Sequence, residues 1–95
     1  MLIVRDVFKA KPGMASKLAQ MFREIWNQEK DFKVRVLTDA VGEYNTVVFE
    51  TEMKDLAALD ARMKMYAERT DMRQKMAGYT DLWTSGHREV LKVVD

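Results

Sequence analysis

The spacing of hydrophobic residues changes several times along the chain, and each change predicts a boundary between two elements. Residues 2–9 are rich in branched and aromatic side chains, which favours a strand. The Lys-Pro-Gly sequence at residues 11–13 breaks this pattern. From Met14 to Ile25 the apolar residues recur mostly at helical spacing, which predicts a helix over residues 14–28.

The middle of the chain predicts a β-hairpin. After a polar break at residues 30–31, Phe32, Val34 and Val36 alternate with charged residues, which is the two-residue period of a half-buried strand. A short connection then leads to a second strand over residues 45–53. Because the connection is short, the two strands should be antiparallel neighbours.

The last part of the chain predicts a second helix and a final strand. Asp55 is placed to cap the helix, because its carboxylate can accept a hydrogen bond from an unpaired backbone N–H. Apolar residues then continue at helical spacing at Leu56, Leu59, Met63 and Tyr66. We expect an interruption at residues 70–71 and a helix end near Gly78. Residues 83–94 form the last predicted strand, with a bend at Gly86.

The predicted order is strand, helix, strand, strand, helix, strand. The 95 residues suffice for one domain and are too few for two, so we expect a single domain over residues 1–95. Both crossover connections should be right-handed. The sequence therefore predicts an α+β, ferredoxin-like fold, in which two helices lie on one face of a four-stranded antiparallel sheet.

The second face of this sheet is the basis for expecting a homodimer. Two helices cover only one face, yet the predicted strands carry apolar residues on both. The uncovered face mixes apolar and charged side chains, namely Ile3, Val7, Leu37 and Val48 with Arg5, Arg35 and Glu50. Soluble monomers rarely expose large apolar patches. We expect two copies to pair through this face, with charges paired across the two-fold axis. The alternative is a monomer with a solvated sheet face.

Composition narrows the range of partners. The 16 basic and 15 acidic side chains nearly cancel, and no run of like charge occurs, so we expect no nucleic-acid or membrane partner. The third strand also lacks the basic, aromatic signature of RNA-recognition motifs. No signal-peptide core or stretch of membrane-spanning length occurs, which makes the cytoplasm the expected location.

Two stretches of the chain resemble a known superfamily. The sequence Phe-Lys-Ala-Lys-Pro-Gly at residues 8–13 resembles the dimeric α+β barrel superfamily, which includes the antibiotic-biosynthesis monooxygenases. Gly42, the segment 45–49 and the sequence Asp-Leu-Ala-Ala-Leu-Asp-Ala-Arg at residues 55–62 are more similar to the NIPSNAP branch. The similarity covers nearly the whole chain. It implies a dimer with facing sheets and, in the enzymatic members, a ligand pocket between each sheet and its own helices.

One activity of that superfamily does not match this chain. Members that degrade haem carry an asparagine on the first strand, and a tryptophan and a histidine on the second helix. Here the first strand offers Asp6, and the second helix has neither tryptophan nor histidine. The resemblance therefore does not imply haem degradation.

The single histidine is the candidate catalytic residue. Histidine suits proton transfer near neutral pH, and His87 shares a strand face with Glu89, a candidate orienting partner. His87 would act as a base or a proton relay. The alternative is a surface or interface histidine bonded to a neighbour. Glu50 and Glu52 also share a strand face, and we interpret them as solvated or salt-bridged rather than as a catalytic pair.

Aromatic residues supply a candidate ligand pocket. Phe22, Trp26, Tyr66 and Trp83 fall on predicted inner faces and would suit a flat organic ligand, although the same pattern fits an ordinary core. One histidine and no cysteine leave too few donors for a transition metal, so we expect no metal site. No phosphate-binding loop occurs either, and we expect no cofactor.

Two classes of function remain open at this point. The first is a homodimer that binds a small hydrophobic or aromatic molecule. If it is an enzyme, the resemblance implies cofactor-independent oxidation or rearrangement of an aromatic or polyketide-like compound. The second is a non-catalytic interaction or regulatory module. A regulatory domain of the ACT type shares the element order, but such domains are usually attached to enzymes.

Overall fold

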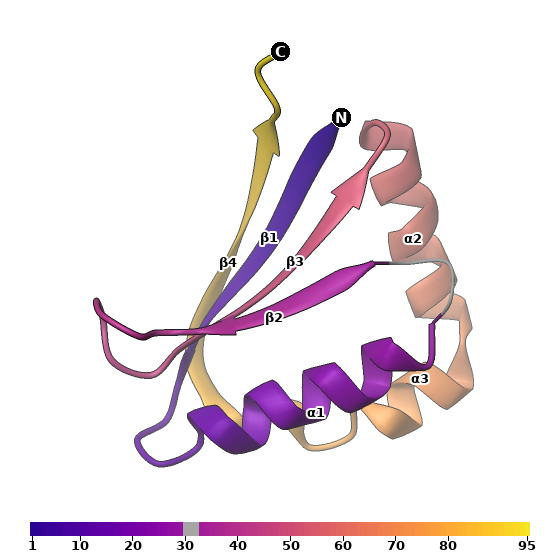
Figure 1. Cartoon of the computed structure of the whole chain (residues 1–95). Helices are drawn as coiled ribbons and strands as arrows, with labels where there is room; N and C mark the ends of the chain where they lie inside the picture. Colours follow the sequence, from indigo (N-terminus) through magenta and orange to yellow (C-terminus); the bar gives the residue numbers. More distant parts are fainter. Residues whose placement is uncertain (30–32) are drawn as a thin grey trace.

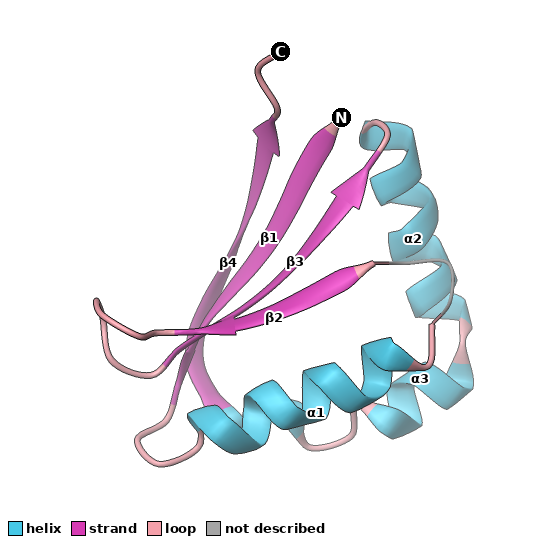
Figure 2. Cartoon of the chain, in the orientation of Figure 1, coloured by secondary structure: helices cyan, strands magenta, loops and turns pink. Residues whose placement is uncertain are grey.

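The strands form one antiparallel sheet in the order β2-β3-β1-β4, and the helices lie on one face of it (Figure 1). The computed structural model describes residues 1–29 and 33–95. The elements, coloured by type in Figure 2, are β1 (Leu2–Ala10), α1 (Ala15–Asn27), β2 (Val34–Thr38), β3 (Thr46–Met53), α2 (Leu56–Glu68), α3 (Thr70–Lys75), the 3-10 helix η1 (Tyr79–Leu82) and β4 (Trp83–Lys92). The α+β, ferredoxin-like prediction is confirmed.

The two faces of the sheet differ in burial. On the central strand β1, Val4, Asp6 and Ala10 are buried against the helices, whereas Ile3 and Val7 on the other face are only half-buried. This alternation follows from the two-residue period of a strand. We call the face without helices the open face.

Helix α1 supplies most of the helical part of the core. Its residues Leu18, Phe22, Ile25 and Trp26 recur at helical spacing and are all buried. They pack in one cluster with Val47 and Phe49 of β3 and with Met72 of α3. The predicted helix over residues 14–28 differs from α1 by one residue at each end.

Helix α2 departs from the prediction. Asp55 caps it as expected, because its carboxylate accepts a hydrogen bond of 2.9 Å from the backbone N–H of Ala58. The predicted apolar face is wrong in part, since Leu56 is 64% exposed and Met63 38% exposed. The buried residue of this helix is Arg62, which lies opposite Asp6 of β1. Arg62 is therefore the most deeply buried residue of the helix, with Leu59 and Tyr66 half-buried on either side of it.

The helix break and the irregularity in the last strand both lie at other residues than predicted. Arg69, with extended backbone angles, separates α2 from α3, one residue before the predicted interruption. The pairing of β1 with β4 shifts at Thr84, and not at Gly86. Gly86 has another role, because a Cβ atom there would lie 3.1 Å from Cδ1 of Phe8. The glycine thus leaves room for the ring on the neighbouring strand.

The predicted hairpin is present as the antiparallel pair β2 and β3, with small differences at its ends. Strand β3 begins at Thr46, one residue later than expected, and β2 starts at Val34. Asn45, at the end of the connection, has a left-handed φ of 64°. The polar break at residues 30–31 and the first alternating residue, Phe32, lie outside the described residues.

Candidate ligand-binding site

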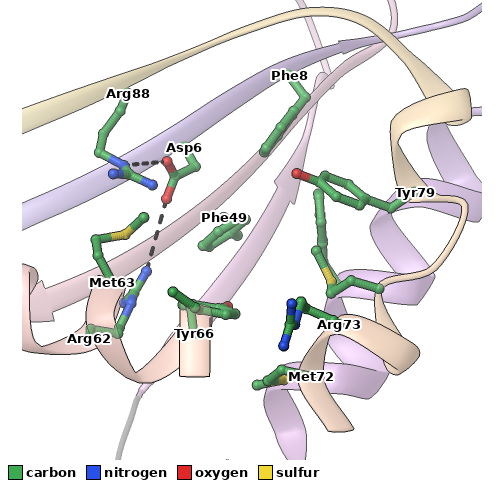
Figure 3. Close-up of a pocket in the computed structure, with 13 residues that line it drawn as sticks. Asp6, Phe8, Phe49, Arg62, Met63, Tyr66, Met72, Arg73, Tyr79 and Arg88 are labelled. Carbon is green, nitrogen blue, oxygen red and sulfur yellow. Dashed lines mark hydrogen bonds and ion pairs between the residues drawn. The ribbon is translucent and has the colours of Figure 1, made fainter. Parts of the chain in front are cut away.

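A cavity of about 390 Å³ lies between the helix-facing side of the sheet and the helices α2 and α3 (Figure 3). Its lining residues come from three strands, β1, β3 and β4, and from the helices α1, α2, α3 and η1. The volume falls near the lower end of the range for small-molecule sites. Helix α2 contributes Arg62, Met63, Tyr66 and Ala67 to the lining.

One wall of the cavity is aromatic. Phe8 lies at its centre, with ring centroids 5.2 Å from Phe22, 6.1 Å from Phe49 and 6.5 Å from Tyr79. Methionines complete the wall at Met63, Met72 and Met76. Aromatic rings present flat faces, and methionine adapts its shape to what it contacts. Such a wall suits a flat, apolar ligand.

The other wall carries a charged trio, Asp6, Arg62 and Arg88. Asp6 on β1 and Arg88 on β4 are register partners, and the Arg88 Nε donates a hydrogen bond of 2.7 Å to Asp6 Oδ1. Arg62 approaches from α2, with Nη2 4.0 Å from Asp6 Oδ2 (Figure 3). The side chains of Asp6 and Arg62 are 7% and 2% exposed, and that of Arg88 is 38% exposed. Two cations therefore share one carboxylate in a largely dry site.

Trp26 holds Arg62 from the other side. The guanidinium carbon of Arg62 lies 5.4 Å from the centre of the Trp26 ring, a cation–π distance. Burial lowers the pKa of Arg62, an effect that the nearby Tyr66 and Asp6 oppose. Arginine stays protonated in proteins, so the site contains a buried positive charge. Burial also raises the pKa of Tyr66 above its ordinary value, which keeps its phenol neutral and able to donate a hydrogen bond.

The cavity opens to solvent between the helices and the edge strand β4. The residues at its opening are exposed, namely Met63, Ala67, Arg73 and Arg88. Next to them Val90, on the helix-facing side of β4, is 40% exposed, because no helix covers that end of the strand. A ligand can therefore enter from the β4 side without displacing the α1 core.

The predicted pocket residues divide into two groups. Phe22 and Tyr66 line the cavity. Trp26 and Trp83 do not line it, but stand behind it: the ring centroid of Trp26 is 5.0 Å from that of Tyr66, and the ring centroid of Trp83 is 5.2 Å from that of Phe8. The two tryptophans therefore support the walls and do not form them.

His87 lies on the open face, on the opposite side of the sheet from the cavity. Its strand partner is Val7, and its side chain is 60% exposed. The predicted partner Glu89 is in place, with Oε2 3.2 Å from the His87 Nε2. The structure therefore brings His87 and Glu89 together, but it separates them from the aromatic pocket residues.

Known structures share the fold of this chain over almost their whole length. An uncharacterized NIPSNAP domain protein from Burkholderia xenovorans superposes with a TM-score of 0.84 at 16% identity, covering 99% of this chain and 95% of that one. A NIPSNAP family protein from Agrobacterium tumefaciens gives 0.82 at 16% identity, covering 100% and 95%. This chain shares the fold of these two NIPSNAP proteins. A structure named as an antibiotic biosynthesis monooxygenase gives 0.71 at 18% identity, covering both chains fully.

The comparisons confirm the predicted resemblance as a likeness of fold. No protein-family model matches the sequence, and no curated protein matches it significantly. At such low identity the NIPSNAP fold carries no residue role with it. The charged trio and the aromatic wall must therefore be interpreted from their own geometry.

The charged trio was not among the predicted site residues. A hint was present, because Asp6 interrupts the apolar strand and Arg62 falls between Leu59 and Tyr66 on α2. Only the strand register and the rotation of α2 bring the three side chains together. In the part of the chain that the structure describes, no three acidic or histidine side chains are grouped to hold a metal ion. None of the described helices combines the length and apolarity needed to cross a membrane.

Proposed function

We propose that the protein binds a small, flat and largely apolar molecule in the cavity beneath α2 and α3, and does so as a homodimer. The observation that supports binding is the combination of an aromatic and methionine wall with a few charged groups in a cavity of about 390 Å³. A module that served only to bind other proteins would be expected to fill its own core. The open cavity favours the small-molecule function over that alternative.

The proposal of a dimer rests on the open face. Leu37, Leu91 and Val93 are 37%, 46% and 39% exposed there, beside the half-buried Ile3 and Val7. Four charged side chains on this face pair within the subunit: Arg35 with Glu50, and Arg5 with Glu50 and Glu89. These paired charges can be buried against a second copy without being isolated, and the exposed Glu52 on the same face is left for a cation of the second copy or for solvent.

A more specific candidate function is a chemical reaction on the molecule bound in the cavity. The fold shared with a protein named as an antibiotic biosynthesis monooxygenase supports cofactor-independent oxidation of an aromatic or polyketide-like compound. His87, predicted as a base or proton relay, faces away from the cavity of its own subunit. In such an enzyme it would act at the dimer interface, whereas Asp6 is the carboxylate that meets the ligand. Oxygen uptake with a panel of polyphenols would test this version.

The binding function is tested with phenylnaphthylamine, a neutral probe whose fluorescence increases in apolar sites. Ala67 is exposed on α2 and lines the cavity, so Ala67→Trp should fill the opening. Ala61 is exposed on the same helix outside the cavity, and Ala61→Trp is the matched control. We expect saturable binding by the native protein, at least tenfold weaker binding by Ala67→Trp, and no change in the control. Equal binding by all three proteins would contradict the proposal.

A further inference from the structure

The carboxylate of Asp6 accepts fewer hydrogen bonds than its chemistry allows. It lines the cavity, and its side chain is 7% exposed. An ionised carboxylate can accept about four hydrogen bonds. From the described residues this one accepts a single bond, from Arg88 to Oδ1, and its Oδ2 accepts none. Because buried acceptors are usually paired, Asp6 is placed to accept a hydrogen bond from a molecule in the cavity.

The groups around this carboxylate determine which donor it can take. Figure 3 shows Asp6 between Arg88, which donates to Oδ1, and Arg62, whose Nη2 lies 4.0 Å from Oδ2. A cationic donor would meet the two guanidinium groups, which stay protonated. An anionic group would be repelled by the carboxylate and would have no proton to donate to it. A neutral O–H or N–H group therefore suits this end of the cavity.

The rest of the lining suits an apolar ring. Phe8 and Phe49 stack with ring centroids 6.1 Å apart, Tyr79 meets Phe8 edge-on at 6.5 Å, and all three line the same cavity as Asp6. We propose that Asp6 is the specificity-determining residue of the cavity, and that it selects flat aromatic molecules with one neutral donor, either a phenolic hydroxyl or a ring N–H. This inference rests on the proposed binding function and assigns it a ligand class.

Pairs of probes with nearly equal shape, with and without the donor, test this ligand class. Naphthol is compared with methylnaphthalene, and indole with indene, by displacement of bound phenylnaphthylamine at about pH 6, where phenols are neutral. A site built to pair with a hydroxyl or N–H group rejects the analogue that lacks it. We expect a donor to displace the fluorescent probe at least tenfold more effectively than its hydrocarbon partner. The pair that shows this preference identifies the donor as a hydroxyl or a ring nitrogen.

The outcomes separate this inference from the proposed function. If the two members of each pair displace the probe equally, or if no compound displaces it while it is bound, the donor selectivity is wrong although the binding function stands. If phenylnaphthylamine itself fails to bind in the cavity, the proposed function is wrong as well.

Asp6→Asn assigns the preference to the carboxylate. The amide keeps the shape of the side chain but loses the charge that strengthens the hydrogen bond. We expect the preference for the donor to fall below threefold, with little change for the hydrocarbon. Asp71→Asn removes an exposed carboxylate of α3 that does not line the cavity, and this matched control should keep the preference.

A second measurement uses only the native protein, because Asp6→Asn also weakens the fold. Naphthols with electron-withdrawing substituents, still neutral at this pH, should bind more tightly as their hydroxyl becomes more acidic, since a carboxylate accepts more strongly from a better donor. A preference unchanged in folded Asp6→Asn, or an affinity that does not depend on the acidity of the hydroxyl, would overturn the assignment.

Discussion

Arg62 of α2 and Asp6 of β1 face each other as two buried charges, with Nη2 and Oδ2 4.0 Å apart. No other residue of α2 is buried to the same extent. The contact therefore sets the rotation of the helix over the sheet, which leaves Leu56 mostly exposed and Met63 partly exposed. The cavity beneath the helix is a consequence of that rotation.

Removing the carboxylate should destabilise the fold strongly. In Asp6→Asn, the carboxylate between Arg62 and Arg88 would be lost, and loss of one partner from a buried pair typically costs about 3 kcal/mol or more. We expect a decrease of that size in the free energy of unfolding, measured by urea denaturation. Glu43→Gln breaks the exposed pair with Lys9 and should cost far less, because solvent screens that pair. Equal effects of the two variants would show that Asp6 is not a structural anchor.

Gly86 should be needed for the packing of Phe8. An alanine Cβ at this position would lie 3.1 Å from the ring and 3.3 Å from the carbonyl oxygen of Val7. Overpacking of this kind costs about 2 kcal/mol. We expect Gly86→Ala to lower the free energy of unfolding by that amount, and by much less in a Phe8→Leu background. Additive effects in this double-mutant cycle would contradict a direct contact.

Acid should weaken the junction between α2 and α3. A hydrogen bond from Arg69 lowers the pKa of Asp71 from 3.8 to about 2. The folded state thus favours the ionised carboxylate, so its contribution is complete above about pH 4 and is lost as the pH falls toward 2. Asp71→Asn should flatten the dependence of the urea midpoint on pH between these values. The difference should shrink in 1 M salt, because the pair is exposed. If the urea midpoint changed with pH in the same way in the native protein and in Asp71→Asn, Asp71 would not contribute to the pH dependence of stability.

The open face should mediate self-association. Leu91 lies on this face as the register partner of Ile3, and Leu91→Glu would place a charge in the interface. We expect the native protein to sediment as a dimer and the variant to dissociate with a constant about 100-fold higher, since a buried unpaired carboxylate costs several kcal/mol. Val41→Glu adds the same charge at a position that is 99% exposed and should not change the assembly. A native protein that sediments as a single chain would exclude the dimer.

Local signals explain which parts of the fold could be predicted. The apolar stripe of α1 and the Asp55 cap depend on residues within one or two turns, so their positions follow from spacing alone. The buried face of α2 could not be obtained in this way. Its spacing favours Leu56 and Met63, and the attraction between Arg62 and Asp6 overrides that preference.

The residues of the candidate site also fall into those that could be predicted from the sequence and those that could not. Aromatic residues on inner faces could be recognised, and Phe22 and Tyr66 do line the cavity. Whether Trp26 and Trp83 reach the cavity or stand behind it depends on how neighbouring rings fill the space. His87 was separated from the pocket by strand parity, which places it on the face of Val7.

The order of the elements, their approximate ends and the difference between the two faces of the sheet could be obtained from the amino-acid sequence, because they depend on periodicity and on capping within a few residues. The hydrogen bond between Asp6 and Arg88, 82 positions apart, and the approach of Arg62 to them arise only when the whole chain is folded. Register and helix rotation are set by the sum of many long-range contacts. The cavity and its charge arise from that sum, and no segment of the chain encodes them alone.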